Sequence, residues 1–482
     1  MRLGDLFAGA PPQARDVEVR ALAYDTRAVA PGSAFFCVRG FTRDGHLLAP
    51  EAVARGAVAL VVDHPLGVGV PEVVVPDVRA AMAPAAARLH GDPTARLRVV
   101  GITGTTGKTT TAYLVRHLLE AGGLPTGLLG TVSAVVGGVQ TPAVRTTPEA
   151  IDLQATFRAM LDAGDRACAM EVSSHALALG RADGVHWSVA LFTNLTQDHL
   201  DFHPTMEDYF LAKRRLFEAD PRVAVVNVDD PYGRRLADEL RGREGLVTIG
   251  VRSDDAGLRA TEVRVDLAGA RFRVGGLELR SPLPGAFNVL NALGALAAAR
   301  ALGVDDAVLA DGLASAPRPP GRFEPVDEGQ PFAVVVDYAH KPDALEAVLR
   351  AARSLTAGRL VVILGAGGDR DRAKRPLMGA AAAAHADLVL VTTDNPRSED
   401  PEAIAAEILA GARGAGSVEV VLDRRAAIER ALALAEAGDT VVLAGKGHER
   451  YQELAGGVRV PFDDVEVARE ALRDLRAAGV RE

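Results

Sequence analysis

Residues 104–109 read Gly-Thr-Thr-Gly-Lys-Thr, a spacing suited to holding a chain of phosphates. The two glycines let backbone N–H groups approach phosphate oxygens, Lys108 can reach the terminal phosphates, and Thr109 offers a hydroxyl to Mg²⁺. An apolar run precedes this loop and an amphipathic run follows it, which predicts strand, loop and helix, with the helix N-terminus adding its dipole. Ile102 stands where the strict pattern has glycine, so the alternative is a Gly-rich turn before a helix. The combination favours binding of a nucleoside triphosphate.

Lysine is rare in this chain. Of 54 Lys and Arg residues only five are lysines, at positions 108, 213, 341, 374 and 446. Where any surface cation suffices the chain uses arginine, so a retained lysine favours a role that needs a primary amine, as a point charge or as a nitrogen that can lose its proton. Chance retention is the alternative at each position, and for Lys213, inside a predicted helix, so is a solvated charge.

Two apolar runs end in residues that can bind a metal. Glu171 closes the run that begins at Ala167, and His199 follows the run that begins at Val189. In an open α/β sheet ligands bind at the carboxyl ends of the strands, so both residues are expected beside the phosphate loop. With Thr109 they could hold Mg²⁺. The alternatives are a salt-bridged carboxylate and a helix-capping histidine.

Strand and helix patterns alternate through the middle of the chain, which predicts a parallel sheet with helices on both faces. Thr147 is a plausible N-cap for a helix with Pro148 at its first position. Residues 245–281 suggest a β insertion. Strands are predicted at 128–132, 167–171, 189–195 and 223–228, and helices at 206–217 and 284–302.

Both ends of the chain read as further α/β units. The first has strand-like runs at 34–38, 57–62 and 73–75, with polar clusters at 25–27 and 41–46 that by themselves suggest solvated loops. The last has runs at 332–336, 360–364, 388–392 and 440–444, each leading into a polar loop, which predicts a second ligand-binding sheet edge. Arg370 stands where a dinucleotide fingerprint needs glycine, which excludes NAD. We predict three domains, 1–92, 93–319 and 320–482.

Composition narrows the class of protein. The 482 residues are 48% hydrophobic and 24% charged, as in ordinary globular proteins. A net charge of −9 argues against a nucleic-acid partner. The sequence shows no apolar run long enough to span a membrane and no apolar stretch of a signal peptide among its first residues, so we expect neither. Cys37 and Cys168 are expected to be buried in a reducing compartment, so we expect a cytoplasmic protein.

A triphosphate site beside polar sheet edges suggests a reaction assembled by domain closure. A kinase needs only an acceptor hydroxyl, whereas a ligase transfers the phosphoryl group to a carboxylate that an amine then attacks. The residues alone favour neither strongly. The acidic and arginine-bearing loops of the last domain suit a zwitterionic amino acid.

Five motifs occur in the order typical of one family. They are 104–109, Glu-Val-Ser-Ser-His at 171–175, Phe-Asn-Val-Leu-Asn at 287–291, Gly-Arg-Phe-Glu at 321–324 and Asp-Tyr-Ala-His-Lys-Pro at 337–342. Together they resemble the Mur ligase motifs and span most of the chain. Asp-Thr-Arg at 25–27 and Asp-Asn-Pro-Arg at 394–397 resemble the member that adds meso-2,6-diaminopimelate. Diaminopimelate has one more carboxylate than lysine, and Arg397 can pair with it bidentately; lysine-adding relatives usually lack this arginine.

The resemblance implies an ATP-dependent ligase of peptidoglycan precursor synthesis. It would phosphorylate the D-glutamyl γ-carboxylate of UDP-N-acetylmuramoyl-L-alanyl-D-glutamate, and the amine of diaminopimelate would then displace phosphate. It implies three domains, namely a small N-terminal α/β domain, a central P-loop ATPase-like parallel-sheet domain and a C-terminal Rossmann-like α/β domain. ATP, two Mg²⁺ ions and a CO₂-derived carbamate on Lys213 are implied. The partners implied are the two substrates and ATP, without nucleic acid or membrane insertion, and we expect a monomer.

The resemblance also assigns residues to each ligand. The catalytic residues are Lys108, Lys213, His199 and Glu171. The residues implied to bind ATP are Gly104, Thr105, Thr106, Gly107, Lys108, Thr109, Thr110, Asn291, Arg322, Asp337 and His340. Those implied to bind the UDP-linked substrate are Thr26, Arg27, Asp44, His46, Thr146, Thr147, Ser173 and Arg181. Those implied to bind diaminopimelate are Arg370, Asp394, Asn395, Pro396, Arg397, Gly445 and Glu449. The implied metal ligands are Thr109, Glu171, His199 and Lys213, the last as N6-carboxylysine.

Three other functions stay open. They are a ligase that adds L-lysine, a folylpolyglutamate-type ligase and a non-catalytic nucleotide-binding regulator. The Asp-Thr-Arg and Asp-Asn-Pro-Arg segments disfavour the second, and the intact set of catalytic residues disfavours the third. Two positions depart from the family pattern: Arg145 stands where some relatives have asparagine, and Lys341 where a smaller or polar residue is often seen.

Overall fold

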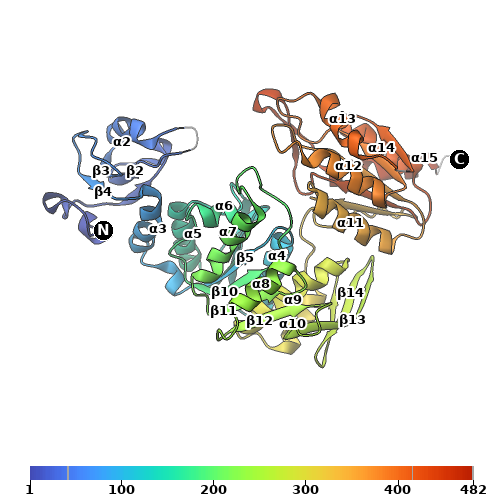
Figure 1. Cartoon of the computed structure of the whole chain (residues 1–482), viewed down its shortest axis with the longest axis horizontal. Coiled ribbons are helices and arrows are strands. Elements are labelled where there is room, and N and C mark those ends of the chain that lie inside the picture. Colours follow the sequence, from blue (N-terminus) through green and yellow to red (C-terminus); the bar gives the residue numbers. More distant parts are fainter. Residues whose placement is uncertain (41–42, 415, 480–482) are drawn as a thin grey trace.

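The computed structural model describes residues 1–40, 43–414 and 416–479. It consists of three α/β units, each built around its own main sheet, which confirms the predicted fold class (Figure 1). The polar cluster predicted at 41–46 begins with two residues outside this described part, and the last three residues of the chain also lie outside it.

The N-terminal unit is a small parallel sheet in the order β1-β2-β3-β4. Its strands are β1 (Ala21–Ala23), β2 (Ser33–Phe36), β3 (Ala57–Val62) and β4 (Glu72–Val74), and its helices are α1 (Leu3–Leu6), α2 (Ala49–Ala54) and α3 (Val78–Leu89). The sequence analysis missed β1, whose residues Ala-Leu-Ala include no β-branched side chain, whereas the valines of the equally short β4 were recognised. Cys37 is buried and free, as predicted.

The central unit holds an eleven-stranded sheet whose middle is parallel and whose two edges are antiparallel hairpins. Its order is β15-β14-β13-β12-β11-β10-β5-β9-β6-β7-β8. The strands of the parallel part are β5 (Arg98–Thr103), β6 (Thr126–Leu129), β9 (Ala167–Glu171), β10 (Trp187–Phe192), β11 (Val223–Asn227) and β12 (Leu246–Gly250). The β insertion predicted at 245–281 begins with β12 and continues through β13 (Leu258–Asp266), β14 (Gly269–Val274) and β15 (Leu277–Ser281). The edge hairpin β7 (Ser133–Val136) and β8 (Val139–Pro142) was not foreseen.

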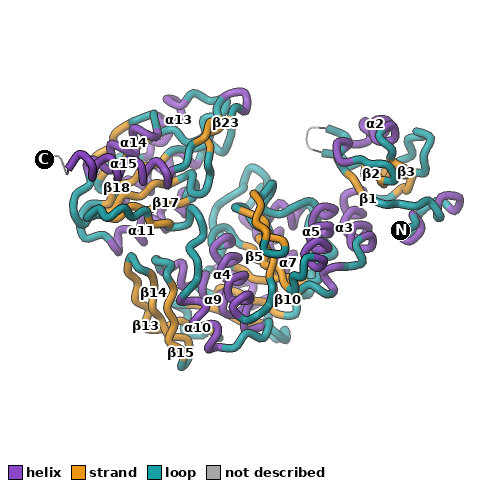
Figure 2. The backbone as a smooth tube through the Cα atoms, turned by 180° about the vertical axis from the view of Figure 1, so that it is seen from behind, coloured by secondary structure: helices purple, strands orange, loops and turns teal. Residues whose placement is uncertain are grey.

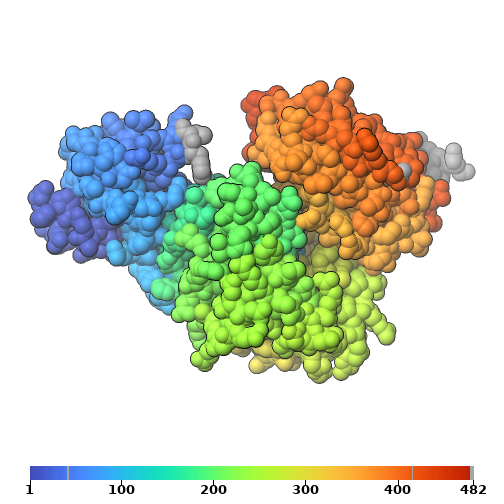
Figure 3. Space-filling model, in the orientation of Figure 1, coloured from blue at the N-terminus to red at the C-terminus, as the bar shows by residue number. Residues whose placement is uncertain are grey.

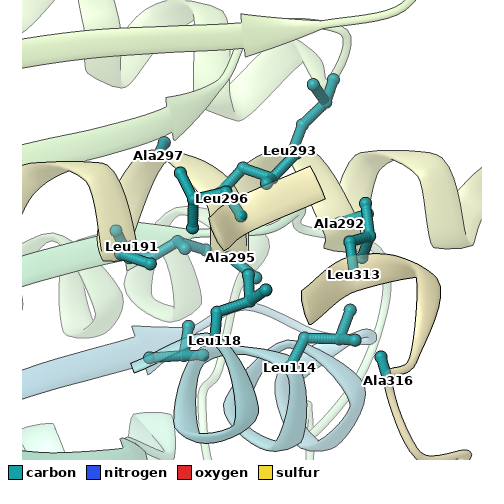
Figure 4. Packing of buried hydrophobic residues seen from close by; sticks show 14 of the residues in the cluster. Leu114, Leu118, Leu191, Ala292, Leu293, Ala295, Leu296, Ala297, Leu313 and Ala316 are labelled. Atoms are coloured by element: carbon teal, nitrogen blue, oxygen red, sulfur yellow. The ribbon is translucent and has the colours of Figure 1, made fainter. Parts of the chain in front are cut away.

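Helices cover both faces of the central sheet, as predicted. Because side chains alternate along a strand, Val100 faces one hydrophobic cluster and its neighbour Val99 faces the other. The first cluster holds α4 (Lys108–Ala121), α9 (Ala286–Ala301) and α10 (Asp306–Ala314), whose leucines and alanines interlock with Leu191 of the sheet (Figure 4). The second holds α5 (Ala150–Asp162), α7 (Met206–Glu218) and α8 (Pro231–Glu239), and the short helix α6 (Ser174–Ala178) contacts α7.

The C-terminal unit is a six-stranded sheet in the order β16-β17-β21-β18-β19-β20, parallel except at β16. The strands are β16 (Glu324–Pro325), β17 (Ala333–Asp337), β18 (Leu360–Leu364), β19 (Leu388–Val391), β20 (Ser417–Val420) and β21 (Thr440–Ala444). Helices α11 (Pro342–Leu355), α12 (Lys374–His385) and α13 (Pro401–Gly411) lie on one face, and α14 (Arg424–Leu434) and α15 (Asp464–Gly479) on the other. A separate hairpin, β22 (Tyr451–Glu453) and β23 (Arg459–Pro461), follows β21.

The N-terminal and C-terminal units sit on the same side of the central unit, with a gap between them (Figure 3). In both ribbon views, α11 of the C-terminal unit lies above β13 and β14 of the central unit (Figure 1 and Figure 2). Each outer unit makes an ion pair with the central one: Arg79 of α3 contacts Glu149, and Lys341 contacts Asp198. Each outer unit therefore contacts the central unit through a charged pair.

Candidate active site

A cavity of about 530 Å³ lies between the central and C-terminal units. It is lined by the phosphate loop, by the carboxyl ends of β9 and β10, by the start of α9 and by residues 337–348. It brings together sixteen of the residues that the sequence analysis assigned: Thr105, Thr106, Gly107, Lys108, Thr109, Thr110, Thr146, Thr147, Glu171, Ser173, Arg181, His199, Asn291, Arg322, Asp337 and His340. Both departures from the family pattern, Arg145 and Lys341, line it as well.

The phosphate loop connects β5 to α4, as predicted, and its two glycines cannot be replaced without strain. Gly104 and Gly107 have φ of 148° and 82°. A Cβ at Gly104 would lie 1.9 Å from Thr193 Oγ, and one at Gly107 would lie 2.3 Å from Asn291 Oδ1. Asn194 stabilises the loop, because its Oδ1 accepts a hydrogen bond from Thr106 N at 2.9 Å. Backbone N–H groups at the start of α4 therefore face the cavity in a fixed arrangement.

Two lysines donate to the same backbone oxygen of this loop. Lys108 Nζ and Lys213 Nζ each lie 2.8 Å from the carbonyl oxygen of Gly104. Burial and, to a lesser extent, the charge of Lys341 lower the pKa of Lys108 to about 8. Lys213 is 1% exposed and stands 4.5 Å above the ring of Tyr209. Burial, with the nearby Lys108 charge, lowers the pKa of Lys213 well below that of a free lysine. Lys213 is therefore buried, which excludes the alternative that it is a solvated charge on a helix surface.

The predicted metal ligands present oxygen and nitrogen donors on this side of the cavity. Glu171 is 1% exposed, and its two carboxylate oxygens accept hydrogen bonds from Thr131 N at 2.8 Å and Thr131 Oγ at 3.1 Å. Thr109 is buried and accepts a hydrogen bond from Arg322 at 3.2 Å. A buried carboxylate oriented by two donors, beside a hydroxyl, is a donor set that fits Mg²⁺.

His199 is held in a strained backbone position beside an acid that the sequence analysis did not assign. Its φ is 53°, in the left-handed region. The neighbouring helices are capped by other residues, α6 by Leu179 and α7 by Thr205, so His199 does not have the capping role that was its alternative. Its Nε2 lies 3.0 Å from Asp198 Oδ2, and the same oxygen receives Lys341 from the C-terminal unit. The histidine and lysine lower the pKa of Asp198, which keeps it ionised. The rarity of lysine was the signal for Lys341; Asp198 gave none apart from its position next to His199.

The far side of the cavity carries the residues assigned to the nucleotide. Asn291 Oδ1 accepts from Thr111 Oγ at 3.4 Å, and the Arg322 guanidinium stacks 4.6 Å from the ring centre of Tyr338. Asp337 accepts from Phe323 N at 2.7 Å, and burial raises its pKa to about 6 although Arg322 opposes this. The Nδ1 of His340 bonds the carbonyl oxygen of Tyr338 at 2.7 Å, so it carries the proton; burial lowers the pKa of His340.

The predicted N-cap role of Thr147 is wrong. Helix α5 begins at Ala150 with Glu149 as its N-cap residue. The Thr147 hydroxyl instead donates to the Glu171 carbonyl oxygen at 2.9 Å and accepts from Ser173 N at 3.1 Å. The Thr147 hydroxyl therefore bonds residues distant in sequence and not the first turn of a helix. These bonds join the two segments, around Thr147 and Ser173, that were assigned to the UDP-linked substrate.

Three arginines converge on Glu149, and two of them, Arg145 and Arg181, line the cavity. Arg145 and Arg181 contact Oε1 at 2.8 and 2.9 Å, and Arg79 of the N-terminal unit contacts Oε2 at 3.1 Å. One carboxylate therefore faces three guanidinium groups, which leaves net positive charge. The positive charge suits an anionic substrate, and Arg145, one of the two departures from the family pattern, contributes to it.

The four N-terminal residues assigned to the UDP-linked substrate lie outside the cavity. Thr26 and Arg27 form a short turn after β1, where Asp25 accepts hydrogen bonds from the Arg27 amide and guanidinium. Asp44 and His46 form another turn, with Asp44 Oδ1 2.6 Å from His46 Nδ1. The structure thus keeps them on the N-terminal unit, apart from the phosphate loop.

The residues assigned to diaminopimelate form a separate cluster at the carboxyl ends of β18, β19 and β21. Asn395 is its hub: its Nδ2 donates to Glu449 at 2.8 Å, and its Oδ1 accepts from Lys446 at 3.1 Å. Lys446 is fully buried and also lies 3.9 Å from Asp394. Arg397 pairs with Glu453 at 3.0 Å. Pro396 and Gly445 complete these loops, and Arg370 is exposed at the edge. Neither Lys446 nor Glu453 was assigned a role from the sequence.

All five lysines of the chain thus lie at these two clusters. Lys108, Lys213 and Lys341 surround the phosphate loop, Lys374 donates to the His340 carbonyl oxygen at 2.9 Å, and Lys446 lies beneath the 394–397 loop. The preference for arginine elsewhere was therefore informative.

Family models match three successive parts of the chain. They are the Mur ligase family catalytic domain at residues 18–91, the Mur ligase middle domain at 102–299 and the Mur ligase glutamate ligase domain at 321–447. A relative from Streptomyces coelicolor is 49% identical over 98% of this chain and 96% of its own length. The chain belongs to the Mur ligase family.

Other comparisons with this Mur ligase agree. A relative from Geobacillus thermodenitrificans is 46% identical over 95% of this chain and 96% of its own. It and the Streptomyces protein are both named UDP-N-acetylmuramoyl-L-alanyl-D-glutamate–2,6-diaminopimelate ligase. A solved structure with the same name is 34% identical and superposes with a TM-score of 0.73, covering 99% of both chains. No described helix of this Mur ligase is long and apolar enough to cross a bilayer.

Proposed function

We propose that this Mur ligase joins meso-2,6-diaminopimelate to the D-glutamyl γ-carboxylate of UDP-N-acetylmuramoyl-L-alanyl-D-glutamate, with conversion of ATP to ADP and phosphate. The observation that carries the proposal is the Asp-Asn-Pro-Arg loop at 394–397, placed beside acidic groups at a strand-end cluster and found in a chain 46–49% identical to ligases of that name. We propose domains 1–92, 93–319 and 320–482 for the UDP-linked substrate, ATP and amino acid respectively.

The first half-reaction transfers the γ-phosphoryl group of ATP to the substrate carboxylate and forms an acyl phosphate. The phosphate loop and Lys108 hold the phosphates, and the N-terminus of α4 faces the charge that develops on them. Mg²⁺, held by Thr109, Glu171 and His199, would neutralise phosphate charge and polarise the transferred group. The arginines around Glu149 would bind the anionic acceptor.

The second half-reaction is attack of the amine of the amino acid on the acyl phosphate carbon. The C–N bond forms, the C–O bond to phosphate breaks, and a proton leaves the amine. Asp394 and Glu449 lie at the cluster that would bind the amino acid, where their carboxylates can accept from its ammonium groups. The cavity between the two units is where the two substrates would meet when the domains close.

We further propose that Lys213 carries a carbamate. Its buried amine has a lowered pKa and is therefore neutral often enough to attack CO₂, forming an N–C bond and losing a proton. The anion produced would replace a buried cation and supply oxygen ligands for a second Mg²⁺. We also propose that the protein is a monomer, because the cavity is formed within one chain. We propose that it acts in the cytoplasm, where ATP is available.

The test is phosphate release with ATP, Mg²⁺ and UDP-N-acetylmuramoyl-L-alanyl-D-glutamate, with diaminopimelate or L-lysine added separately. We expect release with diaminopimelate only, and loss of that release in Arg397→Ala. Release with lysine instead would keep the ligase activity and contradict the role of Arg397. Release with neither would contradict the proposed function.

The carbamate has its own readout. With ¹³C-bicarbonate, we expect a carbamate carbon resonance in the wild-type protein that is missing in Lys213→Arg, since a guanidinium does not form it. A resonance that persists in the variant would place the modification elsewhere.

A further inference from the structure

The Arg397 side chain is fixed by a residue outside the Asp-Asn-Pro-Arg motif. Glu453, the last residue of β22, makes three hydrogen bonds to this loop. Two use its backbone: its carbonyl oxygen accepts from Arg397 N at 3.1 Å, and its amide donates to Asn395 Oδ1 at 2.9 Å. The third uses its side chain, whose Oε2 accepts from Arg397 Nε at 3.0 Å. The hairpin therefore holds the loop by its backbone, and the carboxylate holds only the guanidinium.

The backbone of Arg397 shows that this position is imposed by its surroundings. Its φ is 51°, in the left-handed region that a residue with a long side chain rarely adopts. Such a conformation persists only where neighbouring groups fix it, and it is common at ligand sites. Here the fixing group is the Glu453 backbone, which a side-chain substitution leaves in place.

The contacts leave one edge of the guanidinium available. Nε is bonded to Glu453, and Nη1 donates to the carbonyl oxygen of Gly368 at 2.7 Å. Among the described residues, Nη2 makes no hydrogen bond. A guanidinium has five N–H groups in a rigid plane, so two of them are used and the end formed by Nη1 and Nη2 keeps the other three. That end matches the two oxygens of a carboxylate.

We propose that Glu453 is a positioning residue that turns this end of Arg397 towards the distal carboxylate of the incoming amino acid. The inference rests on the proposed function, because it assigns the ligand of Arg397 to that substrate. Without Glu453 the Arg397 side chain would rotate about its stem, and a carboxylate would meet it in several orientations. The Arg397 and Glu453 side chains are 19% and 25% exposed, so the pair is shielded enough for its geometry to matter yet open to a ligand.

Two other roles for Glu453 give different results. If it acted only to stabilise the hairpin, its removal would lower the melting temperature and affect all substrates alike. If it occupied the binding position of the substrate carboxylate, its removal would strengthen binding of the amino acid.

The experiment compares Glu453→Ala and Glu453→Gln with the wild type in steady-state assays of each substrate in turn. We expect Glu453→Ala to raise the KM for diaminopimelate about tenfold, the loss of one charged hydrogen bond, with little change in kcat or in the KM of ATP and the UDP-linked substrate. Glu453→Gln keeps an acceptor for Nε and should recover part of the loss. Glu419→Ala, which removes an exposed ion pair with Arg430 in the same unit, is the matched control and should change nothing.

A double variant separates positioning from general damage. If Glu453 acts through Arg397, then Arg397→Ala with Glu453→Ala should bind diaminopimelate no more weakly than Arg397→Ala alone, as measured by calorimetry. Additive losses, an unchanged or lowered KM in Glu453→Ala, or equal changes in all three KM values would each overturn the inference. Absence of diaminopimelate-dependent turnover in the wild type would instead refute the proposed function, so the two failures can be told apart.

Discussion

At the scale of single residues, burial sets the protonation of the groups around the cavity. It acts in opposite directions on acids and bases, because it disfavours whichever form is charged. Burial lowers the pKa of Lys108 to about 8, and it raises the pKa of Asp337 to about 6. Perturbed groups of this kind gather where ligands bind, and the binding of a phosphate chain or a cation would supply the missing counter-charge.

Replacing Asp337 with asparagine is expected to stabilise the protein and impair it. The folded-state pKa of this acid lies above its usual value, so the folded state holds a proton that the unfolded state has lost between about pH 4 and about pH 6, and stability falls as the pH rises through that window. Asp337→Asn removes that cost, which is on the order of 1–3 kcal/mol above about pH 6. Calorimetry should show a higher melting temperature at about pH 8 and little change at about pH 4.

The same variant should lose most ATP-dependent phosphate release, because the carboxylate faces the cavity assigned to the nucleotide. Full activity at unchanged KM for ATP would contradict the role of Asp337 in nucleotide binding. A melting temperature that falls at both pH values would show that asparagine cannot keep the hydrogen bond from Phe323.

At the scale of elements, a buried ion pair joins the starts of α14 and α15. Arg424 donates to the two oxygens of Asp464 at 2.7 and 2.6 Å, and both side chains are fully buried. Arg424 also donates to the carbonyl oxygen of Ala444, the last residue of β21 and the neighbour of Gly445. These two helices thus brace the strand end that carries part of the proposed amino-acid site.

Removing one charge of this pair should lower the free energy of unfolding more than removing both charges. Asp464→Asn leaves Arg424 buried without a counter-charge and should cost about 3–5 kcal/mol of unfolding free energy. The double variant Arg424→Met with Asp464→Leu should cost less than the single one, because no unpaired charge remains. Hydrogen exchange of α14 and α15 would measure both, with Arg430→Ala, which removes the exposed pair with Glu419, as a control near zero. A double variant worse than the single would contradict the explanation.

At the scale of the whole molecule, a few charged contacts tie the outer units to the central one. Lys341 reaches Asp198 across 143 positions of sequence, and Arg322 reaches Thr109 at 3.2 Å. The N-terminal unit is tied at Arg79 and Glu149. Contacts of this kind can re-form in a different arrangement, which suits domains that must close on substrates.

Lys341→Ala is expected to let the C-terminal unit move away from the central one. Without ligands, the radius of gyration from small-angle X-ray scattering should increase, because the ion pair with Asp198 is lost. High salt should shift the wild type only partly in that direction, since the pair is shielded from solvent. Arg473→Ala, which removes an exposed pair with Glu328 inside the C-terminal unit, is the control. An unchanged radius would show that other contacts fix the domains.

Arg79→Ala tests the other junction. Because Arg79 supplies one of three guanidinium groups around Glu149 and comes from a different unit, its loss should raise the KM for the UDP-linked substrate several-fold and leave that for ATP unchanged. An equal rise in both would indicate a general loosening of the fold.

The chemistry of the site could largely be predicted from the sequence because it depends on local spacing. The phosphate loop needs glycines and a lysine at fixed intervals, and 104–109 supplies them within a few residues. The long buried strands, such as 360–364 and 440–444, matched their predicted bounds because uninterrupted apolar runs leave little choice. The short strands β1 and β22 contain no β-branched residues and were missed.

The sequence by itself determined the class of fold, the phosphate loop and, through the scarcity of lysine, five positions of interest. Only the tertiary structure decided which groups meet: Asp198 with Lys341, Glu149 with arginines from two units, and Glu453 with Arg397. The tertiary structure also contradicts the predicted N-cap role of Thr147, whose hydroxyl donates to the Glu171 carbonyl oxygen and does not cap a helix. The physical reason is that periodicity and capping follow from neighbours in the chain, whereas pairings between distant segments depend on how the sheets and helices pack.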